Sequence, residues 1–189
     1  KIPGIGALGA LKLLSVLILV VGQAGAYRLA RGWFARGPSL LASAAYAVLP
    51  AVPLIALNRN FLANALGLAL VPWVLAGGRG LLAGERRAAI PYVLALSALL
   101  FTHLLTAYLC GLAVGGLALC LWRQGGWRGG ARLAVASLLA FAMMAFFLVP
   151  QAVEAGWVQL GLQTARQDYR RYFLFARAGE GAYQQTWSG

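Results

Sequence analysis

Residues 88–122 read AAIPYVLALSALLFTHLLTAYLCGLAVGGLALCLW, and arginine lies on both flanks of this apolar run. As a single helix the run would extend about 52 Å, whereas the hydrocarbon core of a bilayer is about 30 Å thick. Lys and Arg collect on the cytoplasmic side of membrane proteins, so both ends should lie there and the run must turn back. We predict two short helices, 88–103 and 106–122, meeting at an outer or mid-membrane turn, with a re-entrant pair as the variant. Gly111 and Gly115 would let the second helix pack closely on a neighbour.

A polar cluster near the middle of this run marks the predicted turn and consists of Thr102, His103 and Thr106. Ionisable groups deep in an apolar segment usually face a cavity or a partner. His103 is the only histidine of the chain. Three roles stay open for it: a general base, a hydrogen-bond donor to phosphate, or a packing residue that caps the turn.

Arginine recurs at every second junction between apolar runs. The clusters are Arg28, Arg31 and Arg36; Arg79, Arg86 and Arg87; and Arg123, Arg128 and Arg132. The intervening junctions carry only Arg59 and His103. This alternation predicts an all-α, polytopic transmembrane helical bundle with both termini of this segment extracytoplasmic. The six predicted crossings are 8–27, 38–57, 61–77, 88–103, 106–122 and 131–149.

Two parts are expected along the chain. Residues 1–150 form the transmembrane domain, and residues 151–189 form an extracytoplasmic segment that lies in the membrane interface. In the second part, apolar residues at helical spacing predict an amphipathic helix: Val153, Trp157 and Leu160. In the first part, Pro50 and Pro53 remove helix donors and predict a kink near the outer end of the second span.

The composition excludes an ordinary soluble domain: 61% of residues are hydrophobic, 11% are charged and the mean hydropathy is +0.76. Soluble proteins carry about 25% charged residues. The net charge of +12 would suggest nucleic acid as a partner, but the basic groups flank apolar spans. We therefore expect membrane lipids as partners and no nucleic acid. The chain begins with Lys1, and we expect it to be a segment of a larger membrane protein that contacts its remainder or other subunits.

The topology brings three polar stretches to the outer side. Arg59 lies in the first, beside Asn58 and Asn64, and its guanidinium suits the phosphate of a lipid-linked substrate or of an ordinary phospholipid. His103 lies in the second. Glu154 lies in the third and would pair with Arg59 or His103, act as a base on a sugar hydroxyl, or simply face solvent. No cofactor is evident; a divalent metal stays open, but nothing in this segment supports one.

The same stretches resemble bacterial polytopic membrane proteins of the GT-C glycosyltransferase superfamily, nearest to the group described as a membrane domain related to 6-pyruvoyl-tetrahydropterin synthase. The likeness lies in Asn58-Arg59-Asn60-Phe61-Leu62-Ala63-Asn64, in Leu100-Phe101-Thr102-His103 and in Val149-Pro150-Gln151-Ala152-Val153-Glu154. It points to Arg59, His103 and Glu154 as site residues, with His103 and Glu154 as the catalytic pair. Asn64 stands where the family motif has an acid. The resemblance also implies the bacterial cytoplasmic (inner) membrane as the location of this chain.

Three functions compete. The first is transfer of a sugar from a polyprenyl-phosphate carrier on the extracytoplasmic face, which the resemblance implies. The second is a non-catalytic membrane scaffold subunit of a larger complex, favoured by the sparse outer chemistry. The third is a transporter with kinked helices around a midplane site, and it ranks last because the spans contain little buried charge.

Overall fold

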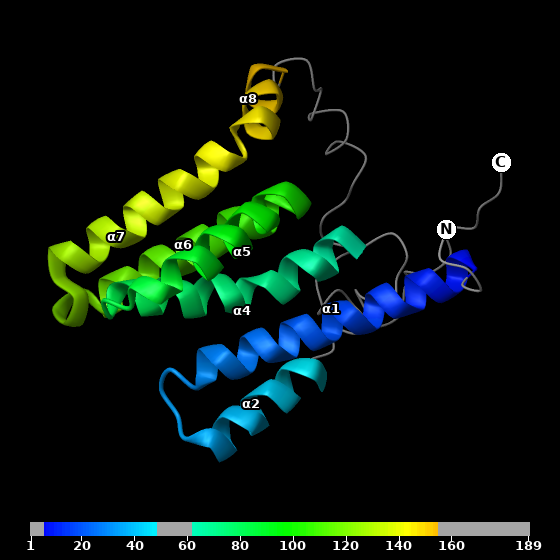
Figure 1. Ribbon diagram of the computed structural model, residues 1–189, viewed down its shortest axis with the longest axis horizontal. Coiled ribbons are helices and arrows are strands. Elements are labelled where there is room, and N and C mark those ends of the chain that lie inside the picture. The colour runs from blue at the N-terminus through cyan, green and yellow to red at the C-terminus, as the bar shows by residue number, and fades with distance from the viewer. Residues whose placement is uncertain (1–5, 49–61, 155–189) are drawn as a thin grey trace, which may run out of the picture. The chain divides into compact units, whose positions relative to one another are not determined.

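The computed structural model describes residues 6–48 and 62–154 (Figure 1). These residues form helices and short turns, with no strand among them, so the predicted all-α class is confirmed. The helices are α1 (Ala7–Ala30), α2 (Arg36–Val48), α4 (Leu62–Leu82), the short 3-10 helix η2 (Arg86–Ala88), α5 (Ala89–Thr102), α6 (Leu104–Cys120), α7 (Trp122–Met143) and α8 (Ala145–Glu154). The chain divides into two compact units, Lys1–Phe147 and Leu148–Gly189, and each is treated by itself below.

Two of the described helices are long and apolar enough to cross a membrane. They are Gly9–Ala30 within α1 and Leu62–Leu82, with mean hydropathies of 1.8 and 1.6 over their best windows. A third span exists only if α7 and α8 are counted together, because the pair bends by 72° at its break. The protein thus has helices that could span a membrane, whereas six crossings stay a prediction.

Helix α4 occupies the centre of the first unit and contacts α1, α5, α6 and α7. In Figure 1 it runs between α1 and the α5–α6 pair. Small residues let α1 approach it closely: a Cβ at Gly25 would lie only 2.6 Å from the indole ring of Trp73. The same indole donates a hydrogen bond to the Val21 carbonyl at 2.9 Å. Close approach through small residues, supported by a polar contact, is typical of helices that associate in lipid.

Glycines also join α4 to α5 and α7. A Cβ at Gly77 would lie 2.8 Å from Tyr92 Cβ, and Tyr92 is only 1% exposed. On α7, Gly125 and Gly129 both face the backbone carbonyl of Leu82, where an added Cβ would lie 2.5 Å and 2.8 Å from its oxygen. These contacts require glycine, since any side chain would separate the helices.

The helix ends match the predicted turn at His103 and differ elsewhere from the limits of the predicted spans. The predicted 88–122 pair breaks at His103, whose φ of −156° and ψ of 95° are extended. The third span was predicted to end at 77, whereas helix α4 continues to Leu82 through buried glycines. The last predicted span, 131–149, coincides with no single helix. Helix α7 begins at Trp122, has a kink at Gly126 and ends at Met143, and Pro150 lies inside α8.

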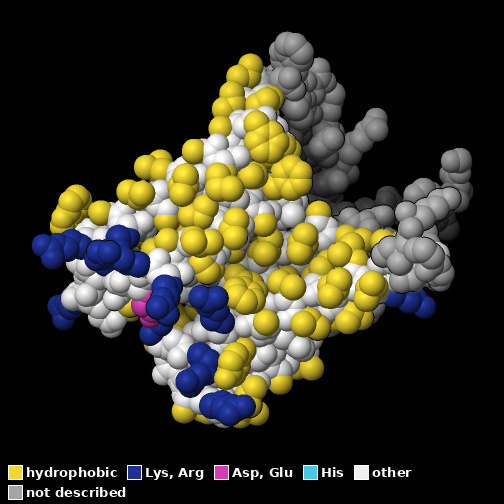
Figure 2. All heavy atoms as spheres, in the orientation of Figure 1, with side chains coloured by type: hydrophobic (Ala, Val, Ile, Leu, Met, Phe, Trp, Pro, Cys, Tyr) yellow, Lys and Arg dark blue, Asp and Glu magenta, His cyan; other side chains and the backbone are white. Residues whose placement is uncertain are grey.

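The arginine-bearing junctions meet at one end of the first unit. There α1 leads into α2, α4 into α5, and α6 into α7, while the other ends of α1, α4 and α5 point away (Figure 1). Figure 2 shows Lys and Arg side chains gathered mainly at this end of the visible face, with hydrophobic side chains over most of the remainder. We call this the arginine end. Pro50 and Pro53 of the predicted kink lie outside the described residues.

Candidate functional site

The break between α5 and α6 is held by the His103 side chain. His103 is the N-cap of α6, and its Nδ1 accepts the backbone N–H of Thr106 at 3.2 Å. The Thr106 hydroxyl lies 2.7 Å from the same nitrogen. A capping acceptor satisfies one of the N–H groups left unpaired at the start of a helix. This is the turn-capping role that the sequence left open, and the structure shows it directly.

Asn64 of α4 extends this cluster. The Thr106 hydroxyl lies 3.5 Å from Asn64 Oδ1, so Asn64, Thr106 and His103 form a continuous polar row from α4 to the break. Gly67 makes room for it, since a Cβ there would lie 3.1 Å from His103 Cβ. Thr106 is 8% exposed and His103 is half-buried. The row lies at the end of α4 and α5 opposite the arginine end.

The hydrogen bonds also assign the tautomer of His103. A ring nitrogen that accepts a backbone N–H carries no proton, so the neutral imidazole has its hydrogen on Nε2. The ring nitrogen that remains available is therefore a donor. Such a group can donate a hydrogen bond to a phosphate oxygen.

Among the other sequence-predicted residues, the structure describes the side chain of Thr102 alone. Asn58 and Arg59 lie outside the described residues. Glu154 is the last residue of α8, in the second unit, and its side chain is not among those described. Thr102 turns back on its own helix, where its hydroxyl donates to the Ala98 carbonyl at 2.8 Å.

A polar pocket of about 200 Å³ lies at the arginine end and is lined by Arg28, Arg31, Arg79 and Glu85, among others. The guanidinium groups that line this pocket already contact other groups of the protein. Arg79 donates to the Gly32 carbonyl and lies 5.1 Å from the Trp33 ring centroid, while Arg31 donates to the Phe34 carbonyl at 2.9 Å. Together these contacts hold the α1–α2 turn against α4.

A second hollow was not anticipated from the sequence. It lies between α5 and α7, has a volume of about 450 Å³, and is lined by apolar side chains together with Arg86 and Arg132. The two arginines belong to different predicted clusters, and their pairing depends on how α5 packs against α7. No periodicity or motif in the sequence indicates it.

Within residues 6–48 and 62–154, no group of three or more His, Cys, Asp or Glu side chains could hold a metal ion. Comparisons of the chain with protein-family models, with curated proteins and with solved structures find no match.

Proposed function

We propose that this chain is the membrane-embedded part of a GT-C-like glycosyltransferase in the bacterial cytoplasmic membrane. In this proposal it crosses the membrane six times with its arginine end in the cytoplasm, and it transfers a sugar from a polyprenyl-phosphate carrier on the extracytoplasmic face. The observation that best supports this proposal is the Asn64–Thr106–His103 row, a polar cluster at the helix ends opposite the arginine end.

The distance of this row from the arginine end fits a helix pair that turns within the bilayer. Helix α5 has 14 residues, which rise about 21 Å from the arginine end. The hydrocarbon core is about 30 Å thick, so with the arginines at the inner surface His103 would lie in the outer part of the core. A polar row there would otherwise be costly in lipid, which favours a role in ligand binding.

In this proposal, the role of each site residue follows from the chemistry of its side chain. The always-charged guanidinium of Arg59 binds the carrier phosphate. The Nε2–H of His103 donates to a phosphate oxygen, in keeping with its assigned tautomer. The amide of Asn64 and the hydroxyl of Thr106 orient the sugar. Glu154 is then the remaining candidate for the base that removes the proton of the acceptor hydroxyl.

Binding of undecaprenyl phosphate to the protein in nanodiscs tests this assignment. We expect Arg59→Gln to weaken binding at least about tenfold, because hydrogen bonds to charged groups contribute about 1.5–3 kcal/mol each. Arg128→Gln removes the same charge at the arginine end and should leave binding unchanged. Equal affinities of wild type and Arg59→Gln would refute the phosphate role of Arg59.

A non-catalytic scaffold subunit is the second candidate, and α6 supports it. A Cβ added at Gly111 or Gly115 would meet no other atom of the described structure within 4 Å, and Leu112 beside them is 59% exposed. An apolar helix face with small residues suits packing on another membrane chain. Under this alternative, we expect Gly111→Leu to abolish co-purification of partner subunits. We also expect the wild-type protein not to bind undecaprenyl phosphate.

A further inference from the structure

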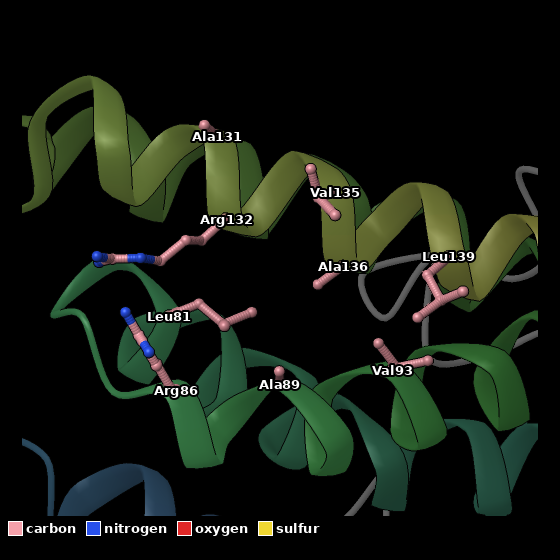
Figure 3. Close-up of a pocket in the computed structure, with 9 residues that line it drawn as sticks. All are labelled: Leu81, Arg86, Ala89, Val93, Ala131, Arg132, Val135, Ala136 and Leu139. Atoms are coloured by element: carbon pink, nitrogen blue, oxygen red, sulfur yellow. The ribbon is translucent and has the colours of Figure 1, made fainter.

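The groove between α5 and α7 combines an apolar length with a cationic end. Its floor and walls include Ala89 and Val93 of α5 and Val135 and Leu139 of α7. Figure 3 shows Arg86 and Arg132 together at one end of this groove, with Val93 and Leu139 towards the other. The volume of about 450 Å³ falls within the range of about 300–1,000 Å³ that is typical of small-molecule sites.

Arg86 and Arg132 have no polar partner among the described residues. Within residues 6–48 and 62–154, neither guanidinium makes a hydrogen bond or an ion pair. Each guanidinium offers five donors in a fork that matches phosphate oxygens. Two like charges directed to the same end of one groove repel each other, and an anion between them removes that cost.

The backbone makes room for this arrangement. Gly84, in the turn after α4, has a φ of +91°, and a Cβ there would lie 3.2 Å from Arg132 Nη1. Glycine at this position therefore serves two needs: the left-handed turn and the space taken by the guanidinium. A larger residue would strain the turn and displace Arg132 from the groove end.

No described residue that lines the groove is acidic. Glu85 is the only acidic residue before Glu154 in the sequence, and it lines the separate polar pocket with Arg28, Arg31 and Arg79. The groove thus keeps its full positive charge, whereas the neighbouring pocket is partly neutralised. Its electrostatic complement is an anion with an apolar tail.

We propose that this groove is a binding site for an anionic glycerophospholipid of the surrounding bilayer. The phosphate lies between Arg86 and Arg132, and one acyl chain extends along Val93 and Leu139. Basic pockets between membrane helices on the cytoplasmic side bind anionic headgroups in this manner. The inference rests on the membrane orientation of the proposed function but not on sugar transfer, since the groove lies at the arginine end, away from His103.

Native mass spectrometry of the protein released from nanodiscs tests the site. The bilayer contains phosphatidylcholine and phosphatidylglycerol in a ratio of three to one, and the readout is retained phosphatidylglycerol. We expect Arg86→Gln with Arg132→Gln to reduce retention at least about tenfold. The matched control, Arg123→Gln with Arg128→Gln, removes the same charge from the same end without touching the groove. Equal loss in both double variants would show a general surface effect and overturn the site.

A second pair of variants tests the apolar length without changing charge. Val135 lines the groove and is 66% exposed, whereas Leu138 on the same helix is 68% exposed and does not line it. Both positions can accept tryptophan without disturbing the core. Val135→Trp should displace phosphatidylglycerol, and Leu138→Trp should not; full retention by Val135→Trp would overturn the proposal even if the arginine variants misfold.

Competition identifies the source of the anion. We expect phosphatidylglycerol to stay bound when equimolar undecaprenyl phosphate is added to the nanodiscs. Its displacement from wild type would assign the groove to the polyprenyl carrier and contradict our choice of occupant. We expect Arg59→Gln to lose undecaprenyl phosphate binding but to retain phosphatidylglycerol as well as the wild type does. This result would show that the groove and the site of the proposed function are different sites.

Discussion

The hydroxyl of Tyr92 lies 2.8 Å from the hydroxyl of Ser137 and links α5 to α7 inside the bundle. The Tyr92 backbone packs directly on Gly77 of α4, so this one residue joins three helices. The groove with Arg86 and Arg132 lies between the same two helices, α5 and α7. Neither Tyr92 nor Ser137 lines the groove, yet their contact joins the two helices that form it.

Removing either hydroxyl should destabilise the protein, but unequally. Ser137→Ala leaves the Tyr92 hydroxyl buried without a partner, which costs about 1–3 kcal/mol. Tyr92→Phe removes the buried hydroxyl itself, and the remaining serine can bond to its own helix, so we expect about 0.6 kcal/mol. Unfolding of the detergent-solubilised protein by sodium dodecyl sulfate measures both. A larger effect for Tyr92→Phe than for Ser137→Ala would contradict this account.

Gly77→Ala tests the closest contact between α4 and α5. The new Cβ would lie 2.8 Å from Tyr92 Cβ and 3.0 Å from Tyr92 Cα, and a backbone atom cannot move aside as a side-chain tip can. We expect a loss of about 1–3 kcal/mol in the free energy of unfolding, measured by the same sodium dodecyl sulfate titration.

Gly111→Ala is the matched control, because a Cβ there meets nothing within 4 Å in the described structure. Alanine is the better helix former, so this variant should be neutral or more stable by up to about 1 kcal/mol. Similar destabilisation of both variants would mean that glycine acts through backbone flexibility rather than through close packing.

The sequence predicted those features that depend on local chemistry. The break at His103 follows from a polar cluster in an apolar run that is too long for one crossing. The grouping of helix ends follows from the spacing of the arginine clusters. Both are properties of short segments and need no knowledge of which helices touch.

Features set by contacts between helices were missed. Residues 123–130 contain four glycines and two arginines and lie between two of the predicted spans. They are helical on either side of the kink at Gly126, because Gly125 and Gly129 pack on the Leu82 carbonyl and this tertiary packing outweighs their low helix propensity. The His103–Thr106 contact is local, yet its link to Asn64 and the pairing of Arg86 with Arg132 require the assembled bundle.

Substitution of His103 distinguishes its role as the N-cap of α6 from a role in phosphate binding. Serine is a strong N-cap residue, so His103→Ser should keep the start of α6 intact, while His103→Ala should lose about 1 kcal/mol. If the imidazole also donates to phosphate, both variants should weaken undecaprenyl phosphate binding to a similar extent. Stability and binding measured on the same samples distinguish the roles. Normal binding by His103→Ser would leave His103 with the structural role alone.

The membrane orientation can be tested with single cysteines in a variant lacking Cys110 and Cys120. Ala83 and Gln124 are exposed at the arginine end, whereas Ala63 is exposed at the opposite end of α4. In intact cells a membrane-impermeant maleimide should label Ala63→Cys but neither of the other two, because the arginine end faces the cytoplasm. Permeabilised cells should show labelling at all three positions, which controls for reactivity. Labelling of Ala83→Cys in intact cells would show that the bundle has the opposite orientation. The groove lipid would then have to come from the outer leaflet.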